Sequence, residues 1–112
     1  MEGTRLNKVA RLLQKDLGEI FQREGTTIFR GKMITVTSVR VSPDLGVAKV
    51  FVSIFPTDKK EDVLLAIKEH TRQIRHELAQ RVRHQLRIIP ELTFFLDDSL
   101  DYIENIDKLL KS

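Results

Sequence analysis

Apolar side chains recur every three or four residues near the start of the chain, between Thr4 and Glu24. That spacing places them on one face of an α-helix. The apolar face consists of Leu6, Ala10, Leu13, Leu17, Ile20 and Phe21. Thr4 is a suitable N-cap, and Gly25 is a suitable residue to end a helix. The pattern therefore predicts a helix over residues 4–24.

The hydrophobic period changes to two residues between Met33 and Phe55, where β-branched side chains dominate. The segment Ser42–Gly46 contains proline, aspartate and glycine, which favour a turn. These features predict a β-hairpin, and the alternation slips near Thr37 or Ser38, which indicates a bulge. One face of the second strand is apolar and is formed by Ala48, Val50, Val52 and Ile54.

Helical periodicity returns at Asp58, a plausible N-cap, and continues to about Gln85. A single helix of that length is long for a small domain, so a break is expected. The most polar gap in its apolar stripe is His70–Arg72, where we predict the break. Residues 88–96 then have the pattern of a short strand, with Pro90 near its start.

The end of the chain, about residues 98–112, has the pattern of a short amphipathic helix with an acidic tail. Its apolar positions are Leu100, Ile103, Ile106, Leu109 and Leu110. The acidic residues in and just before it are Asp97, Asp98, Asp101, Glu104 and Asp107. The predicted order is therefore α-β-β-α-(kink)-α-β plus this C-terminal helix. Helices covering one face of a three-stranded mixed sheet give an α+β two-layer sandwich, in which a right-handed crossover makes the last strand parallel to a hairpin strand.

Composition places the chain among single-domain globular proteins, with 112 residues and a net charge of +3. It contains no cysteine, which excludes disulfides and thiolate chemistry and suits a reducing compartment. No segment has the length of a membrane span or the pattern of a secretory leader. We therefore expect a cytoplasmic protein that does not act at a membrane.

Positive charge is concentrated in the segment Lys68–Arg87, which contains six basic and two acidic residues. Opposite the apolar stripe of the predicted helix lie Lys68, Arg72, Arg75, Arg83 and Arg87. The first helix carries a second basic strip, formed by Arg5, Lys8, Arg11 and Lys15. Such segregated charge is typical of nucleic-acid contact, so these nine residues are the candidate RNA-binding residues. The alternative is an ordinary solvated face, and it has equal weight for the first strip because Asp16 and Glu19 lie near it.

Catalytic and metal sites find no support in the sequence. His70, His76 and His84 are separated by six and eight residues, so no pair has the four-residue spacing of helical metal ligands. Asp97 and Asp98 are adjacent, and adjacent strand residues point to opposite faces. The chain also has no glycine-rich phosphate loop. We therefore expect no cofactor, no metal and no enzymatic activity.

Two other features have ordinary structural interpretations. Phe51, Phe94 and Phe95 have side chains able to stack on bases, but alternating aromatic residues in strands are more often core residues. Arg81 falls toward the apolar side of its helix, where its aliphatic stem is expected to pack along the edge of the core. None of these four residues is included in the candidate RNA-binding set.

Four segments together resemble the bacterial ribosome-binding factor A family. They are residues 41–45 (VSPDL), 48–53 (AKVFVS), 74–78 (IRHEL) and 87–95 (RIIPELTFF). The resemblance implies a KH-like fold of the second type, without catalytic activity. It also implies an assembly factor that binds the 30S subunit during late maturation and rRNA processing, acting on 16S rRNA near its 5′ end.

A KH domain normally holds the RNA backbone with a Gly-x-x-Gly loop between two helices. Glycines occur here only at positions 3, 18, 25, 31 and 46, so the predicted central helices have no such loop. We therefore expect any contact with RNA to occur through helix faces. The resemblance implies that the partner is the small subunit with its 16S rRNA, and we expect a monomer that does not bind DNA. The alternative is a basic KH-like adaptor that binds an acidic protein partner.

Overall fold

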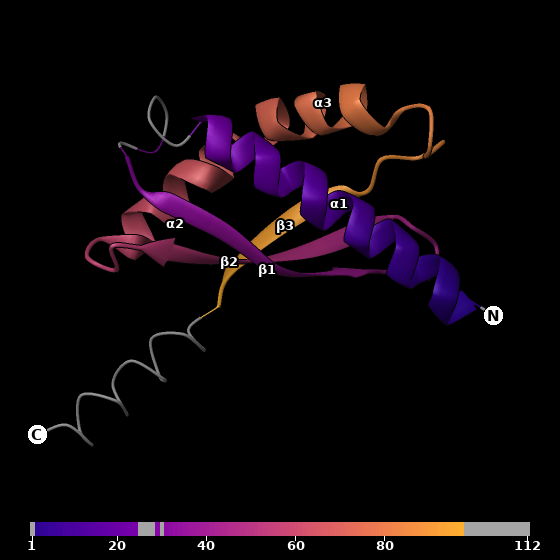
Figure 1. The fold of residues 1–112 in the computed structure, drawn as a ribbon, viewed down its shortest axis with the longest axis horizontal. Helices are drawn as coiled ribbons and strands as arrows, with labels where there is room; N and C mark the ends of the chain where they lie inside the picture. Colours follow the sequence, from indigo (N-terminus) through magenta and orange to yellow (C-terminus); the bar gives the residue numbers. More distant parts are fainter. Residues whose placement is uncertain (1, 25–28, 30, 98–112) are drawn as a thin grey trace, which may run out of the picture.

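The computed structural model describes residues 2–24, 29 and 31–97, and three helices lie on one side of a three-stranded sheet (Figure 1). The elements are α1 (Glu2–Glu24), β1 (Met33–Val41), β2 (Val47–Phe55), α2 (Lys60–Glu69), α3 (Thr71–Val82) and β3 (Glu91–Leu96). This order and the two layers confirm the predicted α+β, KH-like fold. The predicted C-terminal helix, about residues 98–112, lies outside the described residues.

The sheet is mixed and has the strand order β1-β2-β3. Strands β1 and β2 are antiparallel, whereas β2 and β3 are parallel because α2 and α3 form the crossover between them. Val36 pairs with Val52 and Ser38 pairs with Phe51, which leaves Thr37 as the extra residue. The bulge predicted at Thr37 or Ser38 is therefore confirmed.

The hairpin turn is stabilised by hydrogen bonds within residues 42–47, which include the segment whose composition predicted a turn. The Ser42 hydroxyl donates to Asp44 Oδ1 at 2.7 Å, and the Gly46 N–H donates to the same oxygen at 3.0 Å. These two hydrogen bonds stabilise the carboxylate and lower the pKa of Asp44 below its ordinary value. The Val47 N–H in turn donates to the Ser42 hydroxyl at 3.0 Å, so the turn is tied to the start of β2.

The core lies between the sheet and the helices. Phe94 of β3 and Phe21 of α1 meet edge to face with their ring centroids 5.9 Å apart. Every second residue of β2 is buried against the helices: Ala48, Val50, Val52 and Ile54. The same alternation turns Phe51 and Phe95 away from this core, onto the other face of the sheet, so the core prediction holds for Phe94 and is wrong for these two.

Two predicted helix starts are wrong. Helix α1 begins at Glu2, so Thr4 lies inside it and is not the N-cap. Helix α2 begins at Lys60 after Lys59, which has a left-handed φ of 59° and makes no side-chain capping bond. Asp58, the predicted cap, instead accepts a hydrogen bond from Lys32 Nζ at 3.0 Å. The Asp58 side chain therefore contacts a residue distant in sequence and does not cap α2.

The break between the central helices is confirmed at His70, which ends α2 and precedes α3. The N–H of His70 donates to the Ala66 and Ile67 carbonyls, and its Nδ1 lies 2.8 Å from the Ala66 oxygen. The Thr71 hydroxyl donates to the Ile67 carbonyl at 3.2 Å. Polar side chains thus satisfy the last carbonyls of α2 where the helix direction changes.

Candidate nucleic-acid interface

The basic strip of α1 lies on the solvent side of that helix. Arg5, Lys8, Arg11 and Lys15 are exposed, while Leu13 and Leu17 on the opposite side are fully buried. Within the described part of the chain, none of these four side chains forms an ion pair or a hydrogen bond. Their charges are therefore available to an external anion.

The acidic residues near this strip are engaged elsewhere. Arg81 of α3 pairs with Asp16 at 3.4 Å and with Glu19, both on α1. The hydrogen bond that Arg81 donates to Glu19 raises the pKa of the guanidinium above its ordinary value. Arg81 therefore forms an ion pair between two helices, a role that the sequence did not indicate. Asp16 and Glu19, which lie near the strip in sequence, are thus paired with a cation of another helix.

A second ion pair extends this contact between α1 and α3. Arg23 of α1 donates to Glu77 of α3, and its Nε lies 3.3 Å from Glu24. The ion pairs of Arg23 and Arg81 therefore both connect α1 with α3. The four cations of the strip on α1 take no part in these ion pairs.

We expect Arg81→Ala to lower the free energy of unfolding by about 1–2 kcal/mol, because the substitution leaves Asp16 without its partner. The side chains of Arg81 and Asp16 are 30% and 15% exposed, so water compensates only in part. Urea denaturation followed by circular dichroism measures the loss. Arg83 is exposed and forms no ion pair with another described residue, so Arg83→Ala is the matched control, whose effect should stay within about 0.5 kcal/mol. Equal losses in the two variants would contradict the assignment.

Arg75 has a structural role that the sequence did not reveal. Its Nε donates to the Pro90 carbonyl at 3.1 Å and its Nη2 donates to the Ile89 carbonyl at 2.6 Å. These bonds hold the segment that leads into β3 against α3. Although Arg75 is exposed, its guanidinium already has two partners within the chain.

The other cations of the central segment are spread over α2, α3 and the loop that follows α3. Helix α3 ends at Val82 instead of about Gln85, so Arg83 follows the helix and Arg87 lies in the loop before β3. The strand itself begins at Glu91, later than predicted. Pro90 disfavours a helical conformation for Ile89, and the chain must turn here to run parallel to β2.

Arg72 and Arg83 lie on the flank of α3 that faces away from α1. Arg81 contacts α1, and nine steps of 100° place Arg72 on the opposite side of the helix. Arg83 is two steps beyond Arg81, which also turns it away from α1. Lys68, Arg72, Arg83 and Arg87 are exposed and have no ion pair within residues 2–24, 29 and 31–97. The nine candidates therefore form two separated basic areas, one on α1 and one along α2, α3 and the following loop.

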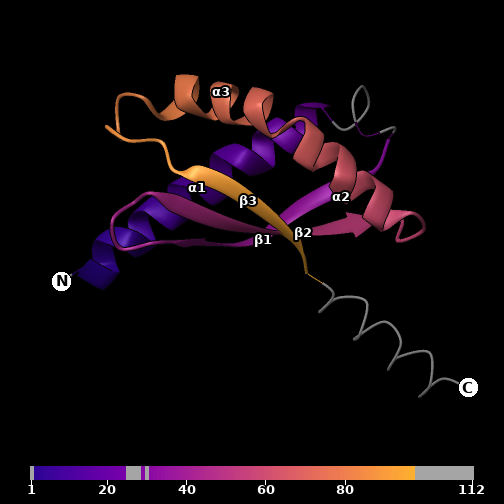
Figure 2. The same cartoon turned by 180° about the vertical axis from the view of Figure 1, so that it is seen from behind.

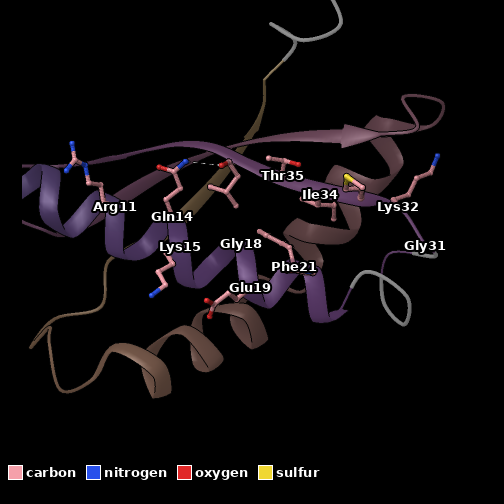
Figure 3. Close-up of a pocket in the computed structure, with 13 residues that line it drawn as sticks. Arg11, Gln14, Lys15, Gly18, Glu19, Phe21, Gly31, Lys32, Ile34 and Thr35 are labelled. Atoms are coloured by element: carbon pink, nitrogen blue, oxygen red, sulfur yellow. Dashed lines mark hydrogen bonds between the residues drawn. The ribbon is translucent and has the colours of Figure 1, made fainter.

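A groove of about 770 Å³ lies between α1 and β1, next to the strip on α1 (Figure 3). Gln14 forms part of its wall and donates to the Val36 carbonyl at 3.1 Å, beside the bulge. Gly18 widens the groove because no atom lies within 4 Å of the position that a Cβ would occupy. Arg11 and Lys15 also line it. Sequence periodicity does not predict such a groove, because two elements distant in sequence form it.

No helix in the described part of the chain combines the length and the apolar character needed to cross a membrane. The same residues contain no group of three or more His, Asp or Glu side chains placed to hold a metal ion. His76 instead lies 3.2 Å from the Gln80 amide nitrogen, on the exposed side of α3. The exposed cations are the chemically distinctive feature of this surface.

Comparison with known proteins identifies the family. The family model for ribosome-binding factor A matches residues 5–110. The chain belongs to the ribosome-binding factor A family. Ribosome-binding factor A of Christiangramia forsetii is 50% identical over 111 residues, which are 98% of this chain and 85% of that protein. The Cytophaga hutchinsonii member is 46% identical over 110 residues, covering 98% of this chain and 83% of that protein.

Solved structures of ribosome-binding factor A have the same fold. The crystal structure of the Thermus thermophilus protein matches with a TM-score of 0.67 and 30% identity, covering 81% of this chain and 94% of that one. A homology model of the T. thermophilus factor, fitted into a cryo-EM map of a 30S complex, matches with a TM-score of 0.62 and 32% identity. The match covers 78% of this chain and 89% of that one. The T. thermophilus factor has thus been placed on the small subunit.

Proposed function

We propose that this protein is a non-enzymatic assembly factor that binds the 30S small ribosomal subunit and its 16S rRNA during late maturation and rRNA processing. The fit of the T. thermophilus factor into a 30S complex supports this function. The observation that carries it in this chain is the exposed strip on α1, whose neighbouring carboxylates are paired with Arg81. The protein acts in the cytoplasm as a monomer and contacts neither DNA nor a membrane.

Binding depends on two basic areas that contact the RNA backbone at separate places. Lys8 and Lys15 of α1 supply cations to one stretch of phosphates, while Arg72 and Arg83 supply cations to another. Phosphate contacts fix the position of a protein without reading base sequence. Two such contacts on a rigid domain suit folded rRNA, which they hold in one conformation until other factors release it. Arg75 acts indirectly by keeping the loop before β3 in place.

The test is sedimentation of the purified protein with immature small subunits in a sucrose gradient, followed by mapping of ultraviolet crosslinks to 16S rRNA. We expect cosedimentation, and crosslinks from peptides that contain the α1 strip or the segment 68–87. Treatment with ribonuclease should release the protein. If the protein instead remained with an acidic protein partner after ribonuclease treatment, the adaptor function would replace this proposal.

A further inference from the structure

The groove between α1 and β1 runs along one edge of the sheet. Strand β1 forms this edge beside α1, whereas β3 forms the other edge beneath the crossover helices α2 and α3 (Figure 2). All the described lining residues come from α1 and from residues 31–36, so the groove includes no part of the α2–α3 junction, where a KH domain has its Gly-x-x-Gly loop. Its volume of about 770 Å³ is in the range of sites that hold a small organic ligand.

The backbone of Ile34 points its N–H and C=O outward at this edge. Residues of an antiparallel strand alternate between those bonded to the neighbouring strand and those with both groups turned away from it. Val36 belongs to the outward set, because its carbonyl accepts a hydrogen bond from Gln14 of α1, as Figure 3 shows. Ile34 precedes Val36 by two residues and belongs to the same set. Its N–H and C=O have no partner in the described part of the chain.

The outward groups of β1 form a short run. The bulge at Thr37 interrupts the regular alternation, and Gln14 already occupies the Val36 carbonyl. An added β-strand is held by a repeating row of free donors and acceptors, which this edge does not offer beyond Val36. One donor beside one acceptor, as on Ile34, matches the pairing edge of a single unpaired base. The backbone therefore favours a nucleotide over a peptide strand.

The charges around the groove favour a ligand that carries phosphate. Three cations line it, and Glu19 is the only carboxylate among its described lining residues. Glu19 is paired with Arg81, so its charge is already compensated. Of the three cations, Arg11 and Lys15 are exposed and form no ion pair with another described residue. An anion at this side of α1 therefore meets two uncompensated positive charges.

The groove also has space and apolar surface for a base. Gly18 lies one turn of α1 beyond Gln14, and the space that its side chain would fill is empty. Met33 lines the groove and is 65% exposed. A thioether makes favourable contacts with aromatic rings, and unpaired bases stack on such surfaces. Polar and apolar groups thus converge on a volume that suits one nucleotide.

We propose that the groove binds one unpaired nucleotide of single-stranded RNA. Arg11 and Lys15 hold its phosphate, the base enters beside Gly18, and the N–H and C=O of Ile34 pair with the edge of the base. This inference rests on the proposed function, because Arg11 and Lys15 belong to the basic strip on α1. It adds a site for an unpaired base to the phosphate contacts with folded rRNA.

Hydrogen exchange of the full-length chain with hexauridylate, a single strand of six nucleotides, tests this directly. Saturating RNA should slow exchange of the Ile34 amide about tenfold, because that N–H gains an acceptor. The Thr35 amide, which the alternation turns toward β2, should keep its rate. Equal slowing of both amides, no slowing at Ile34, or the same slowing by fully paired RNA would overturn the proposal. So would slowing by hexaglutamate, since an acidic peptide would then be the occupant.

Gly18→Leu fills the groove without removing a charge, and Gly18→Ala is its matched control. Gly18→Leu should weaken binding of hexauridylate about tenfold, whereas the smaller alanine side chain should change it less than about twofold. The slope of log affinity against log salt should stay that of the wild type, because no phosphate contact is lost. Thermal midpoints check that both variants fold. Equal affinities of the two variants would contradict the proposed site.

Sedimentation with small subunits separates this inference from the proposed function. If the wild type cosediments with small subunits but Gly18→Leu binds hexauridylate as well as the wild type does, the assembly function stands and the nucleotide site is rejected. If hexauridylate slows exchange at Ile34 but the wild type does not cosediment, the groove binds RNA and the proposed function fails. The two outcomes require different measurements, so neither failure can be mistaken for the other.

Discussion

Phe94→Ala is expected to reduce the free energy of unfolding by about 3–5 kcal/mol, a large share of the roughly 5–15 kcal/mol that stabilises a typical domain. Phe94 is 2% exposed, and its ring meets Phe21 edge to face. Removing the ring leaves a cavity between β3 and α1, which the surrounding structure fills only in part. Urea denaturation followed by circular dichroism at neutral pH measures this loss.

Phe55→Ala provides the matched control because it removes the same ring from an exposed place. Phe55 ends β2 and is 57% exposed. Its removal forfeits little buried area and creates no cavity, so the loss should remain below about 1 kcal/mol. If both variants lost a similar amount of unfolding free energy, Phe94 would be no more buried than Phe55, which would contradict the described core.

The double variant Arg72→Glu/Arg83→Glu is expected to bind small subunits about 10–100-fold more weakly near 0.1 M salt. Each lost phosphate contact should reduce the slope of log affinity against log salt by about 1, so the slope should fall by about 2. Both side chains are exposed and unpaired within the described chain, so the thermal midpoint should hardly change. Binding titrations over a series of potassium chloride concentrations measure affinity and slope together.

Lys8→Glu/Lys15→Glu tests the strip on α1 in the same way and should weaken binding similarly. Lys49→Glu/Lys59→Glu is the control, because each pair of substitutions changes the net charge by about −4 but these lysines lie outside both basic areas. Equal weakening by all three pairs would mean that only net charge matters. Arg75 is unsuitable for this comparison, since its replacement would also remove the bonds to Ile89 and Pro90.

Local interactions explain which parts of the fold were predictable. The hairpin was predicted well because Ser42, Asp44 and Gly46 form their turn with one another. The break at His70 was also predictable, since a polar gap interrupts the apolar stripe there. By contrast, the start of α2 was misplaced because Asp58 contacts Lys32, which lies 26 residues away in sequence. Capping patterns cannot reveal such a competing distant partner.

Hydrophobic period and charge are properties of neighbouring residues, so the order of the helices and strands, most of their buried faces and the cationic character of the candidate interface could be predicted from sequence. Which of the cations remain free of partners among the described residues depends instead on how the chain folds. Arg75 bonds to carbonyls 14 and 15 residues away, and Arg81 pairs with carboxylates 62 and 65 residues away. Chain folding brings these groups together, so a side chain's partner depends on the arrangement of all the elements and not on its own segment.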